Sequence, residues 1–146
     1  MTLHLQAYKK YKQFSVCDSA RATLLTYVGA FESRDANCIA SLTGDGVLVE
    51  LPLIKPNRLF GKSEIERGHL ATFESITDAA FSIDGEVAEN HEAAICIGKI
   101  RISRMGGDIE QHDMGVVAQL TNDKLSRISL YFNSRNIRRW SDKSIL

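Results

Sequence analysis

The amino-acid sequence predicts one α+β domain in which helices come first and an antiparallel sheet follows. Two observations predict this class. Helix-like apolar spacing dominates residues 18–73, whereas the second half holds four strand-like segments separated by short turns. Helices followed by a meander of strands pack as helices on one face of a curved sheet. A chain of 146 residues has the length of one domain with its own core.

Composition narrows the class of function. Apolar residues make up 44% and charged residues 25% of the chain, as in ordinary globular proteins. Eighteen basic and eighteen acidic side chains give a net charge of zero, so we expect neither nucleic acid nor a membrane as a partner. Three cysteines, far apart and without metal-ligand spacing, indicate reduced thiols. With no apolar run of membrane-spanning length, a cytoplasmic protein is expected.

The apolar spacing divides the chain into three parts. Aromatic residues recur every three positions near the N-terminus and predict a helical appendage over residues 1–17. The main domain is expected over residues 18–137. A tail over residues 138–146 holds Trp140 among basic residues. The neutral overall charge favours packing of this tryptophan on the domain or on a partner subunit over contact with nucleic acid.

Two helices are expected to begin the main domain. Asp18 or Ser19 can cap the first, because a side-chain oxygen there accepts unpaired backbone N–H groups. This helix should end near Ser33. Asp35 can cap a second, short helix over Ala36–Leu42.

A strand, a loop and a third helix follow. The strand is expected over Val47–Leu51, where Pro52 ends it. An irregular loop should then run to Gly61, after which Ser63 can cap the third helix. One side of that helix is expected to carry Ile65, His69, Leu70 and Phe73.

Four strand candidates fill the second half of the chain. The connections between them are short and rich in turn-forming residues, which predicts antiparallel hairpins. The four segments are Ala79–Val87, Ala93–Ser103, Met114–Leu120 and Leu125–Phe132.

The register of the second of these strands has two alternatives. Ile97 faces the interior in both. If Gly98 marks a β-bulge, Ile100 faces inward too and the interior is apolar. Without a bulge, Lys99 and Arg101 enter the interior and favour a carboxylate-bearing ligand. A buried unpaired cation is costly, which favours the bulge.

Five short motifs occur in an order typical of one superfamily. They are Tyr27–Asp35, Val49–Pro52, Gly61–Ile65, Glu92–Ala94 and Leu130–Asn133. Their order and spacing resemble the nuclear transport factor 2-like superfamily, in particular its SnoaL-like and ketosteroid isomerase-like branch. The resemblance implies a cystatin-like cone, in which a curved antiparallel sheet wraps a long N-terminal helix and holds a ligand. It also implies a homodimer formed through the convex sheet face.

The resemblance implies candidate catalytic residues. In the isomerases a strand-end carboxylate moves a proton while a helix-one tyrosine and a protonated acid stabilise the enolate. Tyr27 matches the tyrosine. Leu51 stands at the carboxylate position and cannot accept a proton, while Glu50 has the opposite strand parity. The second acid is expected around Met114–Val116, which holds no carboxylate. Asp113 is adjacent, and a one-residue change of register would turn it to the opposite face.

His69 falls where some isomerases have a tyrosine that supports the helix-one tyrosine. A hydrogen bond from Tyr27 to His69 would orient the phenol, and a cationic imidazole would lower the phenol pKa. The alternative is a partly exposed histidine paired with Glu66 or Glu74.

A second constellation resembles scytalone-dehydratase-like relatives. It consists of His69, His112 and Asp113, which would supply the base and the acid of a dehydration. The position of His112 beside a turn favours a surface role instead. We find no Gly-rich phosphate loop, nucleophile motif or metal-ligand spacing, so no cofactor and no metal are expected.

The expected function is that of a SnoaL-like protein that binds a small, mainly apolar ligand in a conical pocket. Catalysis would be cofactor-independent proton transfer by a lyase or isomerase, with Tyr27, His69 and Asp113 as candidates. The alternative is a non-catalytic binding or dimerisation module, which Leu51 favours. The expected ligand-binding residues are Leu51, Phe73, Ile97, Met114, Val116, Leu130 and Phe132.

Overall fold

A computed structural model of the chain describes residues 19–43, 46–51, 57–122 and 124–132. The expected appendage over residues 1–17, the stop at Pro52 and the tail with Trp140 lie outside these residues, as does Cys17.

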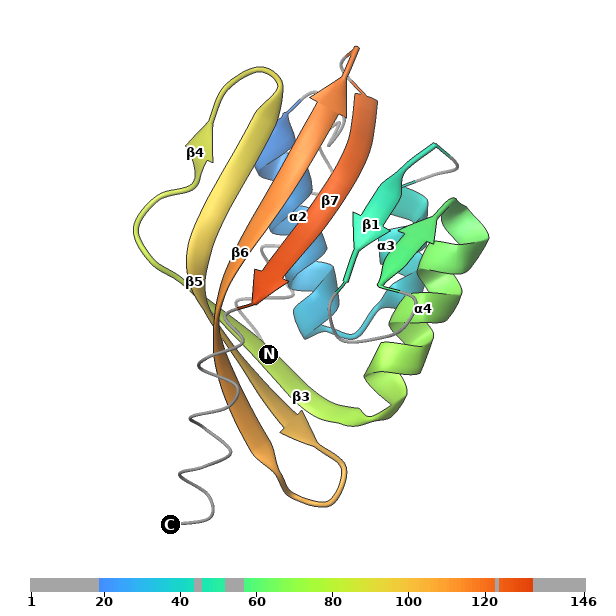
Figure 1. The fold of residues 1–146 in the computed structure, drawn as a ribbon, viewed down its shortest axis with the longest axis vertical. Coiled ribbons are helices and arrows are strands. Elements are labelled where there is room, and N and C mark those ends of the chain that lie inside the picture. Colours follow the sequence, from blue (N-terminus) through green and yellow to red (C-terminus); the bar gives the residue numbers. More distant parts are fainter. Residues whose placement is uncertain (1–18, 44–45, 52–56, 123, 133–146) are drawn as a thin grey trace.

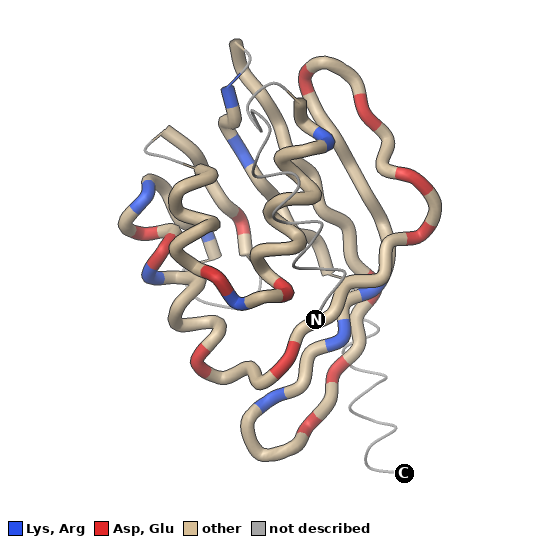
Figure 2. The backbone as a smooth tube through the Cα atoms, turned by 180° about the vertical axis from the view of Figure 1, so that it is seen from behind, with Lys and Arg blue, Asp and Glu red and all other residues tan. Residues whose placement is uncertain are grey.

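The described part of the chain consists of three helices and one seven-stranded sheet (Figure 1). Sheet order is β2-β1-β7-β6-β5-β3, with β4 paired to β5. The helices lie behind the curved sheet, as the reverse view in Figure 2 shows. The elements in chain order are α2 (Ala20–Glu32), α3 (Ala36–Thr43), β1 (Leu48–Glu50), β2 (Arg58–Phe60), α4 (Lys62–Glu74), β3 (Ile76–Ile83), β4 (Ala88–Glu89), β5 (Ala93–Arg104), β6 (Ile109–Thr121) and β7 (Lys124–Phe132).

The α+β cone is confirmed, but the sheet is mixed rather than wholly antiparallel. β1 runs parallel to β7, with Val49 opposite Ile128. A tight turn forces neighbouring strands to be antiparallel, whereas β1 and β7 are separated by most of the domain and are free of that constraint. The sequence did not predict β2. This strand lies within the segment expected to be a loop, and it pairs with β1.

Side-chain caps begin α2 and α3 as predicted. The Ser19 hydroxyl accepts a hydrogen bond from the backbone N–H of Ala22 at 3.2 Å. The Asp35 carboxylate accepts one from the N–H of Cys38 at 2.9 Å. These bonds satisfy donors that have no partner within the helix, so they define where each helix begins.

The start of α4 differs from the prediction. Gly61, not Ser63, is the N-cap residue, and its φ of 88° suits glycine. Ser63 therefore lies in the first turn. Ile65, His69 and Phe73 are buried at intervals of one helical turn, whereas Leu70 is 49% exposed. A residue directly after His69 is turned about 100° around the helix axis, so Leu70 leaves the buried face.

Each register alternative for β5 is correct in one part: the strand has no bulge at Gly98, yet Ile100 faces inward and Lys99 and Arg101 face outward. The strand pairs with β6 without interruption from Ala93 to Ser103, and its burial alternates throughout. Ile97 is 61% exposed and shares the outer face with Lys99 and Arg101. A Cβ on Gly98 would lie 2.0 Å from the backbone oxygen of Ser82. The glycine thus permits a close approach of β3 rather than a bulge.

The core lies between α2 and the inward face of the sheet. Each fully buried aliphatic side chain there contributes about 1.5–3 kcal/mol to stability. Cys38 and Cys96 are buried and form no disulfide. None of the described helices is long and apolar enough to cross a bilayer. The inward sheet residues packed in this core are Cys96, Ile100, Ile102, Val116, Ala118, Ile128 and Leu130.

Candidate functional site

A buried hydrogen bond joins Tyr27 of α2 to His69 of α4. The phenol oxygen lies 2.9 Å from the imidazole Nε2, and both side chains have an exposed fraction of 0%. The predicted bond is therefore present. The alternative, a partly exposed His69 paired with Glu66 or Glu74, is excluded by its burial.

The second nitrogen of His69 fixes the direction of this bond. Nδ1 lies 2.7 Å from the carbonyl oxygen of Ile65, and a carbonyl can only accept. Nδ1 therefore carries the hydrogen, and in the neutral ring Nε2 has a lone pair. It follows that the Tyr27 O–H donates to His69.

Burial keeps both partners neutral. It lowers the pKa of His69 to about 4, although the hydrogen bond to Ile65 favours the charged form. Burial also raises the pKa of Tyr27 well above its ordinary value. The cationic imidazole that would lower the phenol pKa is therefore not formed at neutral pH, because burying a charge in apolar surroundings costs more than one hydrogen bond returns.

Aromatic rings surround the pair. Phe31 packs edge-on against His69 with ring centroids 6.3 Å apart, and against Phe73 at 5.1 Å. Tyr27 packs against Phe31 at 6.1 Å. Leu51, at the end of the first strand, is 0% exposed. Among the described residues, no hydrogen bond joins the Tyr27–His69 pair to a carboxylate.

Glu50 faces away from this interior, as its strand parity predicts. Its carboxylate accepts hydrogen bonds from Arg127 Nε at 3.1 Å, from the Ser129 hydroxyl at 2.7 Å and from Arg58 Nε at 3.2 Å. The bonds from Arg127 and Ser129 lower the pKa of Glu50 below its usual value. Glu50 is thus an ionised partner of two arginines and no substitute for the missing base.

Asp113 also lies outside the interior. Its neighbours His112 and Met114 point inward, so strand alternation turns Asp113 to the outer face. Its side chain is 49% exposed, and its carboxylate lies 4.0 Å from Lys99 Nζ. Asp113, the candidate for the second acid, therefore does not face the interior that holds Tyr27.

The predicted ligand-binding residues lie on the inward side, with one exception. The exception is Ile97, which faces outward because side chains alternate along β5 without a bulge. Phe132 is partly exposed and the others are buried. The inward-facing residues are Leu51, Phe73, Met114, Val116, Leu130 and Phe132.

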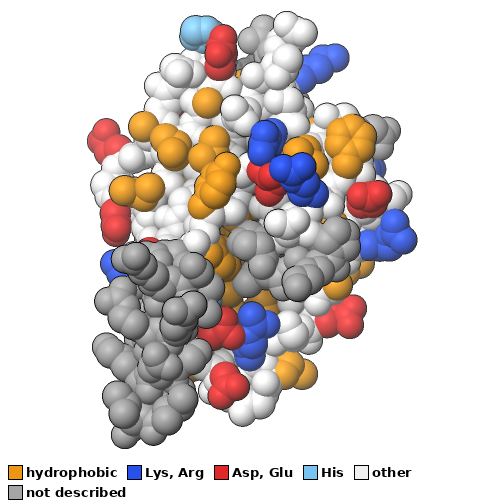
Figure 3. Space-filling view, in the orientation of Figure 1, with side chains coloured by type: hydrophobic (Ala, Val, Ile, Leu, Met, Phe, Trp, Pro, Cys, Tyr) orange, Lys and Arg blue, Asp and Glu red, His pale blue; other side chains and the backbone are white. Residues whose placement is uncertain are grey.

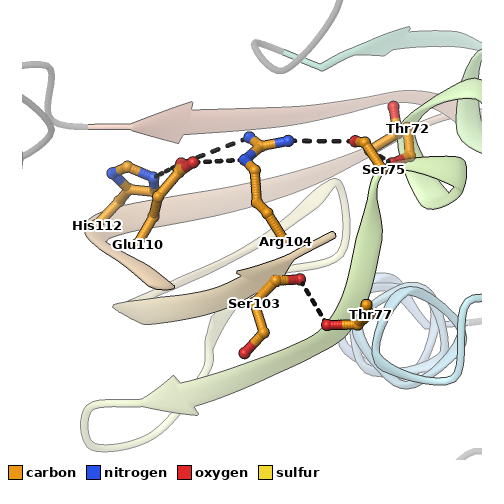
Figure 4. A network of polar contacts seen from close by, with 7 residues as sticks. All are labelled: Thr72, Ser75, Thr77, Ser103, Arg104, Glu110 and His112. Carbon is orange, nitrogen blue, oxygen red and sulfur yellow. Dashed lines mark hydrogen bonds and ion pairs between the residues drawn. The ribbon is translucent and has the colours of Figure 1, made fainter. Parts of the chain in front are cut away.

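His112 is an interior residue that the sequence reading placed on the surface. It is 1% exposed, and its ring stacks on Phe132 at 5.2 Å with an angle of 15°. Its Nε2 lies 3.0 Å from a carboxylate oxygen of Glu110, which is paired with Arg104 (Figure 4). Arg104 in turn donates to the Ser75 hydroxyl at 3.2 Å, at the end of α4.

A signal for this position exists in the sequence. The predicted strand began at Met114, whereas β6 begins at Ile109. Extending the strand upstream puts His112 in the same alternation as Met114 and hence on the inward face. Among the described residues, no group of three or more His, Cys, Asp or Glu side chains is arranged to hold a metal ion.

The outer face of the sheet carries exposed apolar side chains (Figure 3). Ile95 is 45%, Ile97 61% and Tyr131 56% exposed. An open groove of about 510 Å³ runs between Ile97, Tyr131 and the Lys99–Asp113 pair. Met114 and Phe132 also line this groove, whereas Tyr27 and His69 do not.

No protein-family model matches the sequence, and no curated protein matches it either. Many solved structures are similar in fold. A hypothetical protein with a ketosteroid isomerase-like fold from Catenulispora acidiphila DSM 44928, solved in complex with trimethylamine, has a TM-score of 0.68 at 10% identity. The match covers 79% of this chain and 88% of that one.

Two further structures extend the comparison. A SnoaL-like polyketide cyclase from Agrobacterium tumefaciens str. C58 has a TM-score of 0.66 at 15% identity, covering 84% of this chain and 98% of that one. A nuclear transport factor 2-like protein from Anabaena variabilis ATCC 29413 has a TM-score of 0.65 at 14% identity, covering 91% of both chains. At these identities the likeness concerns the fold, and the chain therefore has the nuclear transport factor 2-like fold that SnoaL-like and ketosteroid isomerase-like proteins share.

Proposed function

We propose that the protein binds a small, mainly apolar molecule in the interior between α2, α4 and the inward face of the sheet. The observation that carries this proposal is the neutral Tyr27–His69 pair, enclosed by aromatic rings. Its donated hydrogen is used within the pair, so the Tyr27 oxygen offers only lone pairs to a ligand. Such a site suits an apolar molecule with a hydrogen-bond donor.

Leu51 supports binding without isomerase chemistry. It is buried at the strand end where the isomerases have their proton-moving carboxylate. The hydrocarbon side chain of Leu51 can contact an apolar ligand but cannot accept a proton. The ketosteroid isomerase-like neighbour was solved with trimethylamine, which supports small-molecule binding in this fold.

A second candidate is proton transfer by a cofactor-independent lyase or isomerase. The observation in its favour is the directed bond from Tyr27 to His69. A substrate could give a proton to the phenol oxygen while the phenol passes its own proton to Nε2. The low pKa of His69, about 4, opposes this route because the imidazolium is a poor product at neutral pH. Binding is therefore the leading proposal.

Methyl NMR tests the binding proposal. Toluene and phenol are titrated as probes into protein labelled at Met, Leu and Ile methyl groups, because phenol carries a hydrogen-bond donor and toluene carries none. We expect the methyl signals of Leu51 and Leu130 to shift, while that of Ile97, on the outer face, stays unchanged. Shifts confined to Ile97, or none anywhere, would overturn the proposal.

Deuterium exchange separates the two candidates. Cyclohexanone is incubated with the protein in D₂O, and loss of its α-proton signals is followed. Exchange at the solvent rate supports binding alone. Faster exchange that disappears in Tyr27→Phe supports proton transfer.

We also propose that the protein forms a homodimer through the outer sheet face. The support is the exposed apolar group of Ile95, Ile97 and Tyr131, since a twofold contact buries the same patch on both subunits. Light scattering should give a dimer for wild type and a monomer for Ile97→Lys. Met105→Lys is the control, because Met105 is 65% exposed in the hairpin turn after β5. A monomeric wild type would contradict the proposal.

A further inference from the structure

His112 occupies a defined position on the inward face of β6. Its side chain is 1% exposed and lies parallel to the Phe132 ring. Hydrogen bonds hold the ring from one side only. Figure 4 shows Nε2 directed at Glu110, with the guanidinium of Arg104 beyond it.

Glu110 determines which nitrogen of His112 carries the hydrogen. Burial alone would raise the pKa of Glu110, but hydrogen bonds from Arg104 and His112 lower it below its usual value. The ionised carboxylate can only accept, so the His112 Nε2–H donates to it at 3.0 Å. In the neutral ring, Nδ1 therefore carries a lone pair.

That lone pair is unused. Nδ1 of His112 is buried and has no hydrogen-bond partner among the residues that the structure describes. A buried polar atom without a partner costs about 1–3 kcal/mol, and native proteins seldom leave one so. The Glu110 carboxylate holds the His112 ring in place, so the lone pair on Nδ1 points in a fixed direction.

The charges around the ring define what can fill this position. The negative charge of Glu110 is paired with Arg104, so the site offers no net charge to attract an ammonium group. A carboxylate is also excluded, since a lone pair repels it. A neutral hydroxyl donates one hydrogen and fits an apolar surrounding that includes Phe132 and Met114.

We propose that His112 Nδ1 accepts a hydrogen bond from a neutral hydroxyl group, so that the interior selects small alcohols or phenols over hydrocarbons and ethers of the same shape. This inference rests on the proposed binding function and deepens it. Glu110 and Arg104 act as positioning residues, because they hold His112 and do not reach the ligand.

The test compares phenol with anisole, which has the same ring but a methyl ether in place of the hydroxyl. Affinities are measured by methyl NMR on the intact chain. Wild type should bind phenol about five- to tenfold more tightly than anisole, the value of one neutral hydrogen bond. His112→Phe keeps the stacking on Phe132 and should lose this preference. Asp113→Asn, next in the strand but on the outer face, should keep it.

Two further measurements keep the test decisive if His112→Phe is poorly folded. His112→Asn places an amide near the position of Nδ1 and should retain part of the preference. In wild type at pH 8, the ¹⁵N signal of Nδ1 should be that of an unprotonated nitrogen and should move with phenol but not with anisole. A protonated Nδ1 would overturn the inference.

The outcomes separate this inference from the proposed function. If toluene binds but phenol and anisole bind equally, only the role of His112 is overturned. If His112→Phe still prefers phenol to anisole, the role of His112 is likewise overturned. If no probe binds wild type at millimolar concentration, both the binding function and the role of His112 are overturned.

Discussion

The Tyr27 hydroxyl donates to Nε2 of His69 over 2.9 Å, and this bond links α2 to α4 inside the cone. The two groups are distant in sequence and neither reaches solvent. Each satisfies the other, so loss of one leaves a buried polar atom without a partner. The bond therefore affects both stability and the polarity that a ligand meets.

Removing either partner should destabilise the protein. Tyr27→Phe leaves Nε2 without a donor and His69→Phe leaves the phenol without an acceptor, so each should cost about 1–3 kcal/mol in urea unfolding. The double variant should cost less than the sum, because no orphaned group remains. Tyr131→Phe, at a side chain 56% exposed, is the control. Equal stability of Tyr27→Phe and this control would contradict the bond.

Stability should fall between pH 6.5 and pH 4 because of His69. In the unfolded chain the imidazole binds a proton below its ordinary pKa of 6.5, whereas in the folded state it does so only near 4. The unfolded state binds more protons in this window, so stability rises with pH through it, by up to about 3 kcal/mol. Unfolding free energies measured at intervals across the window test this.

Two variants identify the titrating group. His69→Gln should flatten the dependence between pH 4 and 6.5. Glu50→Gln should not, because the lowered pKa of Glu50 gives a contribution that is lost only as the pH falls below the ordinary carboxylate range. A wild-type slope that survives in His69→Gln would show that another group titrates.

Gly98 should tolerate no side chain. The Cβ of Gly98→Ala would meet the Ser82 backbone oxygen at 2.0 Å, so the two strands must separate. We expect a loss of about 3 kcal/mol or more. Gly115→Ala is a matched control on the neighbouring strand, where the nearest atom is 3.6 Å away, and should change stability by less than about 1 kcal/mol. Thermal or urea unfolding of both variants distinguishes a close approach from a bulge, which would accept alanine.

Local chemistry in the sequence predicted much of the fold. Ser19 and Asp35 cap helices because their oxygens lie next to unpaired N–H groups, a relation within four residues. The hairpins of the second half follow from short turns. The parallel pairing of β1 with β7 did not follow, because it depends on how distant segments meet. Gly98 was misread for the same reason, since its neighbour Ser82 belongs to another strand.

Residues of the site could be predicted only from strand alternation or from the resemblance to a known superfamily. Tyr27 and His69 came from the resemblance, and their bond is present. The face of Asp113 stayed open and a surface role was favoured for His112, because the predicted strand began too late for its alternation to include them. The neutral state of His69 depends on complete burial, which spacing along one helix does not reveal.

Long-range ¹H–¹⁵N correlation spectra of the histidine rings test the central claim, a neutral and buried Tyr27–His69 pair, most directly. From pH 5.5 to 8, His69 should show a protonated Nδ1 and an unprotonated Nε2, with no change of either signal. A His69 ring that titrates near pH 6.5, or that carries its hydrogen on Nε2, would contradict the account.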